Sequence, residues 1–285
     1  MSLESAPPFV HLRVKSAYSL ADGAIPVKGL VKLAAGLDMP AVALTDRGNL
    51  FGALEFAVTA ADAGLQPVVG AVLGLNRASD EPGATTADPD RLLLLAQDQT
   101  GYENLMALVS KGFLEGEGIE PAVDFADLSA RAEGLIALDG VKGSPLGRHL
   151  MDGSTRAAAH LKAMQSLFDG RLYLEIQRHG QPHERALEAR LLPLAAEHGL
   201  PIVATNDAHF AGKDQFDAHE VLSCIAQGVT LAHRDRRRLT PEHYFKTSED
   251  MARLFADLPE AVENTWKIAR RCAVMPRLHP PILPA

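Results

Sequence analysis

The chain has 285 residues and a formal net charge of −8 at pH 7, with 47% hydrophobic and 22% charged residues. This composition predicts a globular protein with room for one large α/β domain or two small ones, and no apolar run reaches the roughly 18 residues that cross a bilayer. The negative charge argues against a surface that binds nucleic acid throughout, because such surfaces are basic, so any DNA contact is expected to be local or supplied by a partner.

The first eight residues, Met1–Pro8, are expected to be a disordered lead. They lack the basic region and apolar core of a signal peptide. The two cysteines, Cys224 and Cys272, form no motif and fit a reducing, cytoplasmic environment.

Seven short segments rich in β-branched and aliphatic residues are predicted to be strands. They are Phe9–Val14, Ala41–Thr45, Pro67–Leu75, Leu92–Ala96, Leu135–Leu138, Leu172–Ile176 and Pro201–Thr205. Helical patterns separate most of them, which predicts a largely parallel sheet covered by helices. Polar residues follow two of the strands, at Asp46-Arg47 and at Asp207 and His209. This favours a β/α barrel over an open sheet, because the chemistry of such barrels sits at the C-terminal strand ends.

The helices predicted between these strands are Val27–Leu37, Asn49–Ala63, Gly101–Phe113, Arg156–Phe168 and Glu184–Glu197. Asn49 is a candidate N-cap. Pro193 predicts a kink or a break in the last of them, because proline removes a backbone donor.

From about residue 214 the pattern becomes helical. The predicted helices there are Asp217–Gln227, Met251–Leu258 with a cap at Ser248–Asp250, and Glu260–Cys272. We therefore expect a barrel core at about residues 9–213, a helical extension at about 214–274, and a proline-rich linker at 275–285 toward a domain absent from this chain.

Asp207 and His209 follow an apolar run and stand two residues apart. At a strand end their side chains would point the same way, and a carboxylate beside an imidazole suits a divalent metal. A hydrogen-bonded structural pair is the alternative. His11 and His179 are expected to be structural, and His219 to have a surface or packing role.

The one basic run spans residues 234–238. A solvated turn is the expected interpretation, and a phosphate contact is the alternative.

Three segments carry a family resemblance. His11–Gly23 resembles the opening motif of the polymerase-and-histidinol-phosphatase (PHP) domain, Ala43–Gly52 its second motif and Thr205–His209 its last. Tyr173–Gly180 and Tyr244–Lys246 narrow the resemblance to the alpha subunits of bacterial DNA polymerase III. The resemblance implies a distorted seven-stranded TIM-like barrel of the PHP type. It also implies that active members bind a cluster of divalent metals at the strand ends and hydrolyse phosphoesters, in some polymerases as a 3′–5′ exonuclease.

The chain departs from the pattern that the resemblance implies for the metal site. Only Asp22, Asp207 and His209 keep ligand chemistry. Six positions at which the resemblance implies a ligand hold Arg13, Lys15, Arg47, Val72, Arg91 and Val141.

Four of these replacements are cations, which offer no lone pair and repel a metal ion. We therefore expect no metal cofactor, or at most one weakly held manganese or zinc ion. Our hypothesis is that salt bridges have replaced the metals, which requires an acidic partner beside Arg13 and Arg47. An anion-binding site and a residual metal-dependent phosphoesterase or exonuclease are the alternatives.

The resemblance further implies a DNA-directed DNA polymerase, a nucleotidyltransferase, at full length, with catalytic aspartates and Mg²⁺ outside this chain. The fragment itself is expected to be catalytically inactive and structural. Its expected partners are the polymerase domain of the same chain, a separate proofreading exonuclease subunit, other replicative subunits and, through the full-length protein, DNA. No membrane contact is expected.

Overall fold

The structure is a computed structural model that describes residues 8–20, 22–77, 88–116, 120–234 and 236–276. The predicted lead at 1–8 and linker at 275–285 lie outside these residues, apart from Pro8, Met275 and Pro276. Within the described residues, no helix is both long and apolar enough to span a membrane.

One sheet organises the molecule. Its strands are β1 (Ala41–Arg47), β2 (Gln66–Leu75), β3 (Asp90–Ala96), β4 (Ala122–Val123), β5 (Leu135–Asp139), β6 (Leu172–Ile176) and β7 (Ile202–Ala204). They are ordered β1-β2-β3-β5-β6-β7, with β4 paired to β2. All pairs are parallel except those of β3, which runs antiparallel to β2 and β5. The prediction of a largely parallel sheet is therefore confirmed, with β3 as the antiparallel exception. No helix among the described residues separates β2 from β3, and antiparallel neighbours need no helical crossover.

The first predicted strand, Phe9–Val14, is an extended segment rather than a regular strand. It nevertheless joins the two edges of the sheet. Ala43 N donates to the carbonyl oxygen of His11 at 2.8 Å, and beyond β7 the Ala208 N donates to the carbonyl oxygen of Arg13 at 3.2 Å. The sheet therefore curls back on itself into the distorted TIM-like barrel that the sequence predicted.

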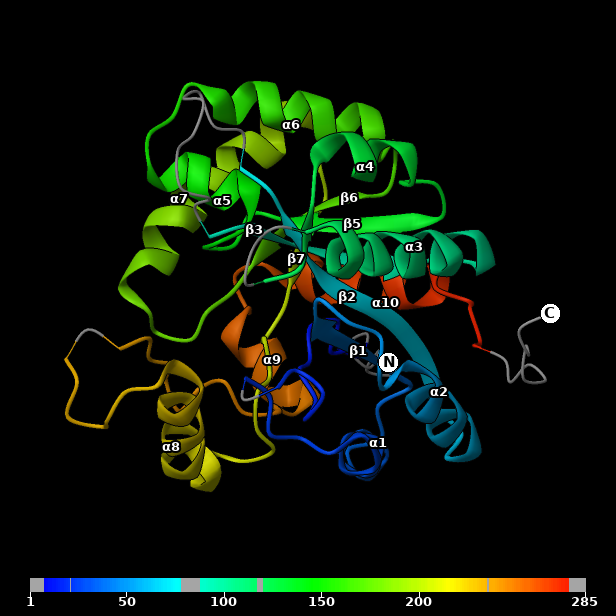
Figure 1. Cartoon of the computed structure of the whole chain (residues 1–285), viewed down its shortest axis with the longest axis vertical. Helices are drawn as coiled ribbons and strands as arrows, with labels where there is room; N and C mark the ends of the chain where they lie inside the picture. The colour runs from blue at the N-terminus through cyan, green and yellow to red at the C-terminus, as the bar shows by residue number, and fades with distance from the viewer. Residues whose placement is uncertain (1–7, 21, 78–87, 117–119, 235, 277–285) are drawn as a thin grey trace, which may run out of the picture.

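Among the described residues, the helices before residue 199 cover this barrel (Figure 1). They are α1 (Val27–Gly36), α2 (Ala53–Asp62), α3 (Gln99–Glu115), α4 (Phe125–Ala130), α5 (Pro145–Met151), α6 (Arg156–Leu167) and α7 (Pro182–His198). Alternate strand residues point to opposite faces, so one set fills the barrel and the other packs under the helices. The inner set includes Ala43, Val68, Val72, Leu93, Leu95, Leu138 and Val203.

Three further helices form the extension: α8 (Phe216–Gln227), α9 (Ser248–Leu254) and α10 (Pro259–Arg271). Ile268, Ala269 and Cys272 at the end of α10 belong to the inner core. Gln66, the first residue of β2, donates to the carbonyl oxygens of Ala269 and Cys272, both at 2.6 Å. The end of α10 therefore packs at the N-terminal end of β2.

Arg178 ties the extension to the barrel. Its guanidinium contacts Glu188 of α7 and Asp257, just before α10, each at 2.6 Å. It also lies over the ring of Phe255, 4.7 Å from the centroid. The Tyr173–Gly180 segment thus contributes a structural clamp.

Three local predictions need correction. Helix α7 has no break at Pro193, because Leu187, Leu191 and Ala195 anchor it on both sides, and the alternative of a kink there stays a prediction. Helix α2 begins at Ala53, so Asn49 is no cap; its side chain instead bridges the carbonyls of Tyr18 and Arg47. Thr247, whose hydroxyl accepts from Asp250 N at 3.0 Å, caps α9 in place of Ser248–Asp250.

His11 supports a pH prediction. It is fully buried against Phe245, and burial lowers its pKa from 6.5 to about 4. Because the unfolded chain takes up this proton at higher pH than the folded chain, the stability from neutral His11 is lost as pH falls from about 6.5 toward about 4. We compare wild type with His11→Gln by urea unfolding. The difference between their free energies of unfolding should fall by about 2–3 kcal/mol as the pH is lowered from about 7 to about 4.5. A gap that does not change with pH would contradict this.

Candidate functional site

The polar residues of the barrel gather at the C-terminal ends of its parallel strands, as predicted. Arg13 and Glu175 form the innermost pair, with Nε–Oε1 at 2.7 Å and Nη2–Oε2 at 2.6 Å. Both are buried. Glu175 also accepts from Thr205 Oγ1 and from Gln177 Nε2. Its carboxylate is therefore saturated with donors.

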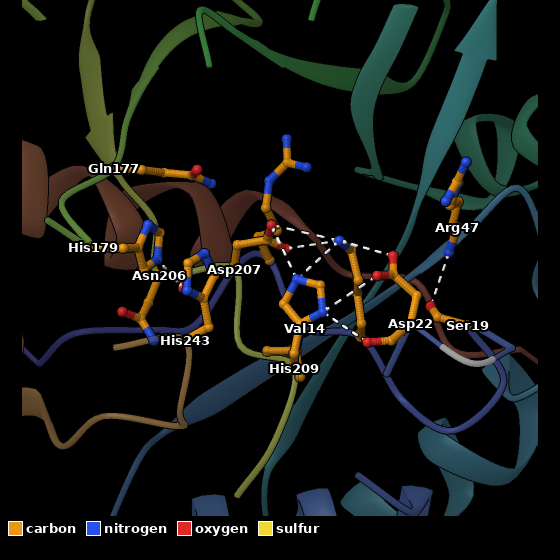
Figure 2. Close-up of polar contacts among 12 residues, drawn as sticks. Val14, Ser19, Asp22, Arg47, Gln177, His179, Asn206, Asp207, His209 and His243 are labelled. Carbon is orange, nitrogen blue, oxygen red and sulfur yellow. Dashed lines mark hydrogen bonds and ion pairs between the residues drawn. The ribbon is translucent and has the colours of Figure 1, made fainter. Parts of the chain in front are cut away.

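Lys15 occupies the centre of the site. Its Nζ lies 3.2 Å from Asp22 Oδ2, 3.4 Å from Asp207 Oδ1 and 3.1 Å from His209 Nε2. Figure 2 shows Asp22, Asp207 and His209 drawn together by these contacts. The three residues that keep ligand chemistry therefore surround an ammonium group.

The hydrogen bonds assign the tautomer of His209. Its Nδ1 lies 2.7 Å from the carbonyl oxygen of Asp22 and must donate there. In the neutral ring Nε2 then carries a lone pair, which accepts from the Lys15 ammonium. A protonated ring would point a second N–H at that cation.

The charges of this group balance. Arg237, from the loop after α8, pairs with Asp22 Oδ1. Two carboxylates thus face two cations, Lys15 and Arg237, which together carry the charge of one divalent ion. Burial alone would raise the pKa of Asp22 and Asp207, but Lys15 and the other favourable groups around them together outweigh it and hold both pKa values well below the ordinary range.

Asp207 reaches Lys15 by a local backbone turn. Strand β7 ends at Ala204, and Asp207 has a φ of 40°, in the left-handed region that costs a non-glycine residue roughly 1–2 kcal/mol. The expectation that alternation along a strand would align Asp207 with His209 is therefore wrong. The two side chains meet at Lys15 because the turn brings them together.

A second ion-pair group lies on β1 and β3. Glu120 accepts from Arg47 Nε at 2.6 Å and from Arg91 Nη2 at 2.8 Å. Burial would raise the pKa of Glu120, yet the two guanidinium groups lower it to about 2. Gly74 lets the chain beside Glu120 approach β2 closely, because a Cβ there would stand 2.5 Å from the Pro121 carbonyl oxygen.

The remaining substituted positions offer no ligand. Val72 pairs with Arg47 in the register of β1 and β2 and lies in the inner core. Val141 follows β5 and is buried. The four cations and two valines thus lie in the barrel or around its mouth, and the acidic partners that our hypothesis required for Arg13 and Arg47 are present.

Sequence reasoning missed Glu120, Glu175 and Arg237. Glu175 gave a signal, since it is a charged residue in the otherwise apolar run Leu172–Ile176. Glu120 gave none, and Arg237 gave only its place in the basic run, because their partners are far away in the sequence. The interpretation of the basic run as a solvated turn is wrong for Arg237 and for Arg236, which pairs with Glu220 at 2.5 Å.

Two other histidines support the site from outside. His219 is buried, and its Nε2 donates to the carbonyl oxygen of Asp22 at 2.8 Å, beside the bond from His209. His179 bridges Glu184, at 2.9 Å, and the carbonyl oxygen of Asn206, at 2.5 Å. The structural role expected for His179 is confirmed.

The donor set does not fit a metal ion. The Lys15 ammonium fills the point that Asp22, Asp207 and His209 share, and it has no lone pair to offer. In the part of the chain that the structure describes, no group of three or more His, Cys, Asp or Glu side chains could hold a metal.

The mouth opens into a cleft of about 960 Å³. Its charged lining comprises Arg47, Arg77, Arg91, Lys111 and Arg237, with Asp22, Asp88, Glu115, Glu120, Asp124 and Asp127. Because acidic side chains are at least as numerous as basic ones, the cleft is not an electropositive anion site.

Comparison with known proteins agrees with this architecture. A model of the PHP domain matches residues 11–179, and the chain belongs to the PHP domain family. It is similar to the DNA polymerase III subunit alpha of Caulobacter vibrioides, at 46% identity over 100% of this chain and 25% of that protein. The corresponding proteins of Rickettsia conorii and Escherichia coli K12 are 40% and 41% identical, over 98% of this chain and 23% and 24% of theirs.

The chain thus spans about a quarter of the length of these curated relatives. Among solved structures, an amidohydrolase from Chromobacterium violaceum has a TM-score of 0.44 and 16% identity, covering 75% of this chain and 96% of that one. That likeness is too distant to indicate fold or function.

The role of the Lys15 charge can be tested by substituting methionine, which removes the ammonium group and keeps a side chain of similar length. Lys15→Met leaves two buried carboxylates facing each other, and we expect the free energy of unfolding at pH 7 to fall by roughly 3–5 kcal/mol. The double variant Lys15→Met/Asp207→Asn should recover part of this loss, because it removes one of the two charges. Urea unfolding of all three proteins gives the comparison.

Lys267→Met is the matched control for that experiment. Lys267 is exposed on α10 and, among the described residues, forms its ion pair with Glu263, so its loss should change stability by less than about 0.5 kcal/mol. If Lys15→Met lowers the free energy of unfolding no more than Lys267→Met does, the central ammonium is dispensable.

Proposed function

We propose that this chain is the PHP domain of a DNA polymerase III alpha subunit in which ion pairs have replaced the metal cluster. The observation that carries the proposal is the position of Lys15 Nζ, within 3.4 Å of Asp22, Asp207 and His209. Similarity over the whole chain to alpha subunits supports the choice of protein. In this proposal the full-length protein is a cytoplasmic DNA-directed DNA polymerase.

The ion pairs remove the chemistry that a metal-dependent phosphoesterase needs. Such an enzyme lowers the pKa of a metal-bound water and polarises the phosphoryl oxygen. An ammonium held by two carboxylates does neither, and an incoming ion would have to displace Lys15 beside Arg237. The domain therefore binds no catalytic metal, and Mg²⁺ serves the polymerase domain outside this chain.

The same contacts suit a scaffold. Arg13 and Glu175 are 162 residues apart, and Arg237 and Asp22 are 215 apart, so the pairs fix distant segments against one another. We propose that this rigid domain braces the polymerase and docks a separate proofreading exonuclease subunit. A polymerase whose built-in nuclease is lost needs proofreading from a partner.

Metal content tests the inactive site. After equilibration with Mn²⁺ and Zn²⁺ and desalting, the chain should retain well below about one equivalent of metal, because the donors of the site already hold a cation. Added metal should not stimulate hydrolysis of bis(p-nitrophenyl) phosphate. Retention of two or more equivalents, with hydrolysis that Asp207→Asn abolishes, would establish the metal-dependent phosphoesterase or exonuclease instead.

Docking has its own test. Isothermal titration of the chain with the exonuclease subunit of the same organism should give a one-to-one complex. If no heat of binding is seen at micromolar concentrations, the docking role is wrong. The account of the metal site would not be affected by that result.

A further inference from the structure

Four large apolar side chains are exposed on α2 and α3. Phe51, just before α2, is 61% exposed, and Val58 on α2 is 38% exposed. On α3, Met106 is 37% exposed and Phe113 is 52% exposed. Residues seven apart lie on the same side of a helix, so each helix carries an apolar stripe. We call these four side chains together the α2–α3 face.

The two stripes meet at both ends of the face. At one end, the rings of Phe51 and Phe113 lie 6.1 Å apart between centroids. At the other end, Tyr102 in the first turn of α3 packs against the apolar cluster that contains Phe56 and Ala60 of α2. The helix rises about 16 Å from Tyr102 to Phe113, at roughly 1.5 Å per residue. The α2–α3 face is therefore one continuous surface.

The described chain ends where this face begins. After α10, Ala273 N donates to the carbonyl oxygen of Gln97 at 2.8 Å, immediately before α3. Val274 is buried in the same apolar cluster against which Tyr102 packs. Figure 1 shows this red end of the described chain below α3 and above α2. The polypeptide thus leaves the described residues at Pro276, near the start of α3.

The segment that follows has the chemistry to cover an apolar face. Residues 277–285 contain no acidic side chain. Their apolar side chains are Leu278, Pro280, Pro281, Ile282, Leu283 and Pro284. Proline-rich segments dock on aromatic surfaces at a small entropic cost, because their backbone is already restricted. At roughly 3.1 Å per residue this segment reaches about 28 Å, which exceeds the length of the face.

We propose that residues 277–285 of this chain fold back over the α2–α3 face and bury its aromatic pair. Ile282 and Leu283 reach Phe51 and Phe113, because extended chain covers about 19 Å between Pro276 and Ile282. The chain is thereby carried from the end of α10 to the rim of the barrel mouth, where Phe51 follows β1. In a longer alpha subunit the polypeptide would continue from that rim. This inference does not depend on the proposed function.

Connectivity favours this segment over a separate protein or a second copy of the chain. The segment is tethered at the edge of the face, which gives it an effective concentration on the order of millimolar. A competing molecule would have to displace it.

The rate of maleimide labelling tests whether the face is covered. The native cysteines, Cys224 and Cys272, are both buried, so a cysteine introduced on the face reports its own exposure. Met106→Cys should react roughly tenfold more slowly than the same variant with Ile282→Asp/Leu283→Asp, because the charged segment leaves the face open. Mass spectrometry should find a single label per chain, since unfolding would also expose Cys272.

A second set of variants changes the face and leaves the segment intact. Phe51→Ser/Phe113→Ser removes the aromatic pair, and it should speed the labelling of Met106→Cys as much as the two aspartates do. Ile225→Cys is the matched control, because Ile225 is 71% exposed on α8, at the lower left of Figure 1 and away from α2 and α3. Its labelling rate should be the same in all these backgrounds.

Two results would overturn the proposal. If Met106→Cys reacts equally fast with and without the aspartates, at a rate that does not change on dilution, the segment leaves the face open. If its labelling is slow, accelerates on dilution and ignores the aspartates, a second copy of the chain covers the face instead.

Discussion

The ammonium of Lys15 is the interaction on which the site depends. Two buried carboxylates, Asp22 and Asp207, cannot both stay ionised in the mouth of an apolar barrel without counter-charge. Lys15 supplies that charge at 3.2 and 3.4 Å, and Arg237 completes it from the solvent side. A cation in a fixed place lets these two carboxylates coexist in the folded protein.

The segment that carries Lys15 also closes the barrel. Residues 9–16 lie between β1 and the chain after β7, and they bring Arg13 and Lys15 to the mouth from the same stretch of backbone. Barrel closure and charge balance therefore support each other. Ala208 N bonds to the Arg13 carbonyl oxygen while the two neighbouring residues, Asp207 and His209, contact Lys15. A shift of this segment would disturb the sheet and the ion pairs together.

The network extends outward to the helical extension. Asp22 links the inner site to His219 of α8 and to Arg237 of the following loop. The polar face of α8 is thereby committed to the barrel, and its aliphatic face is left to solvent. The same contacts that balance the charge of Asp22 thus determine which face of α8 is exposed. Buried ion pairs add little net stability over apolar packing, so their main contribution here is to fix positions.

The sequence by itself determined most of the strand segments and helices, and it singled out Asp22, Asp207 and His209 together with the cations of the site. Each of these is a local property, read from hydrophobic pattern or from a short motif. Only the tertiary structure decided that β3 runs antiparallel, that Asp207 reaches Lys15 through a left-handed turn, and that Glu175, Glu120 and Arg237 complete the ion pairs. Those partners lie up to 215 residues from the groups they neutralise, and local periodicity carries no information about which distant carboxylate a buried cation will meet.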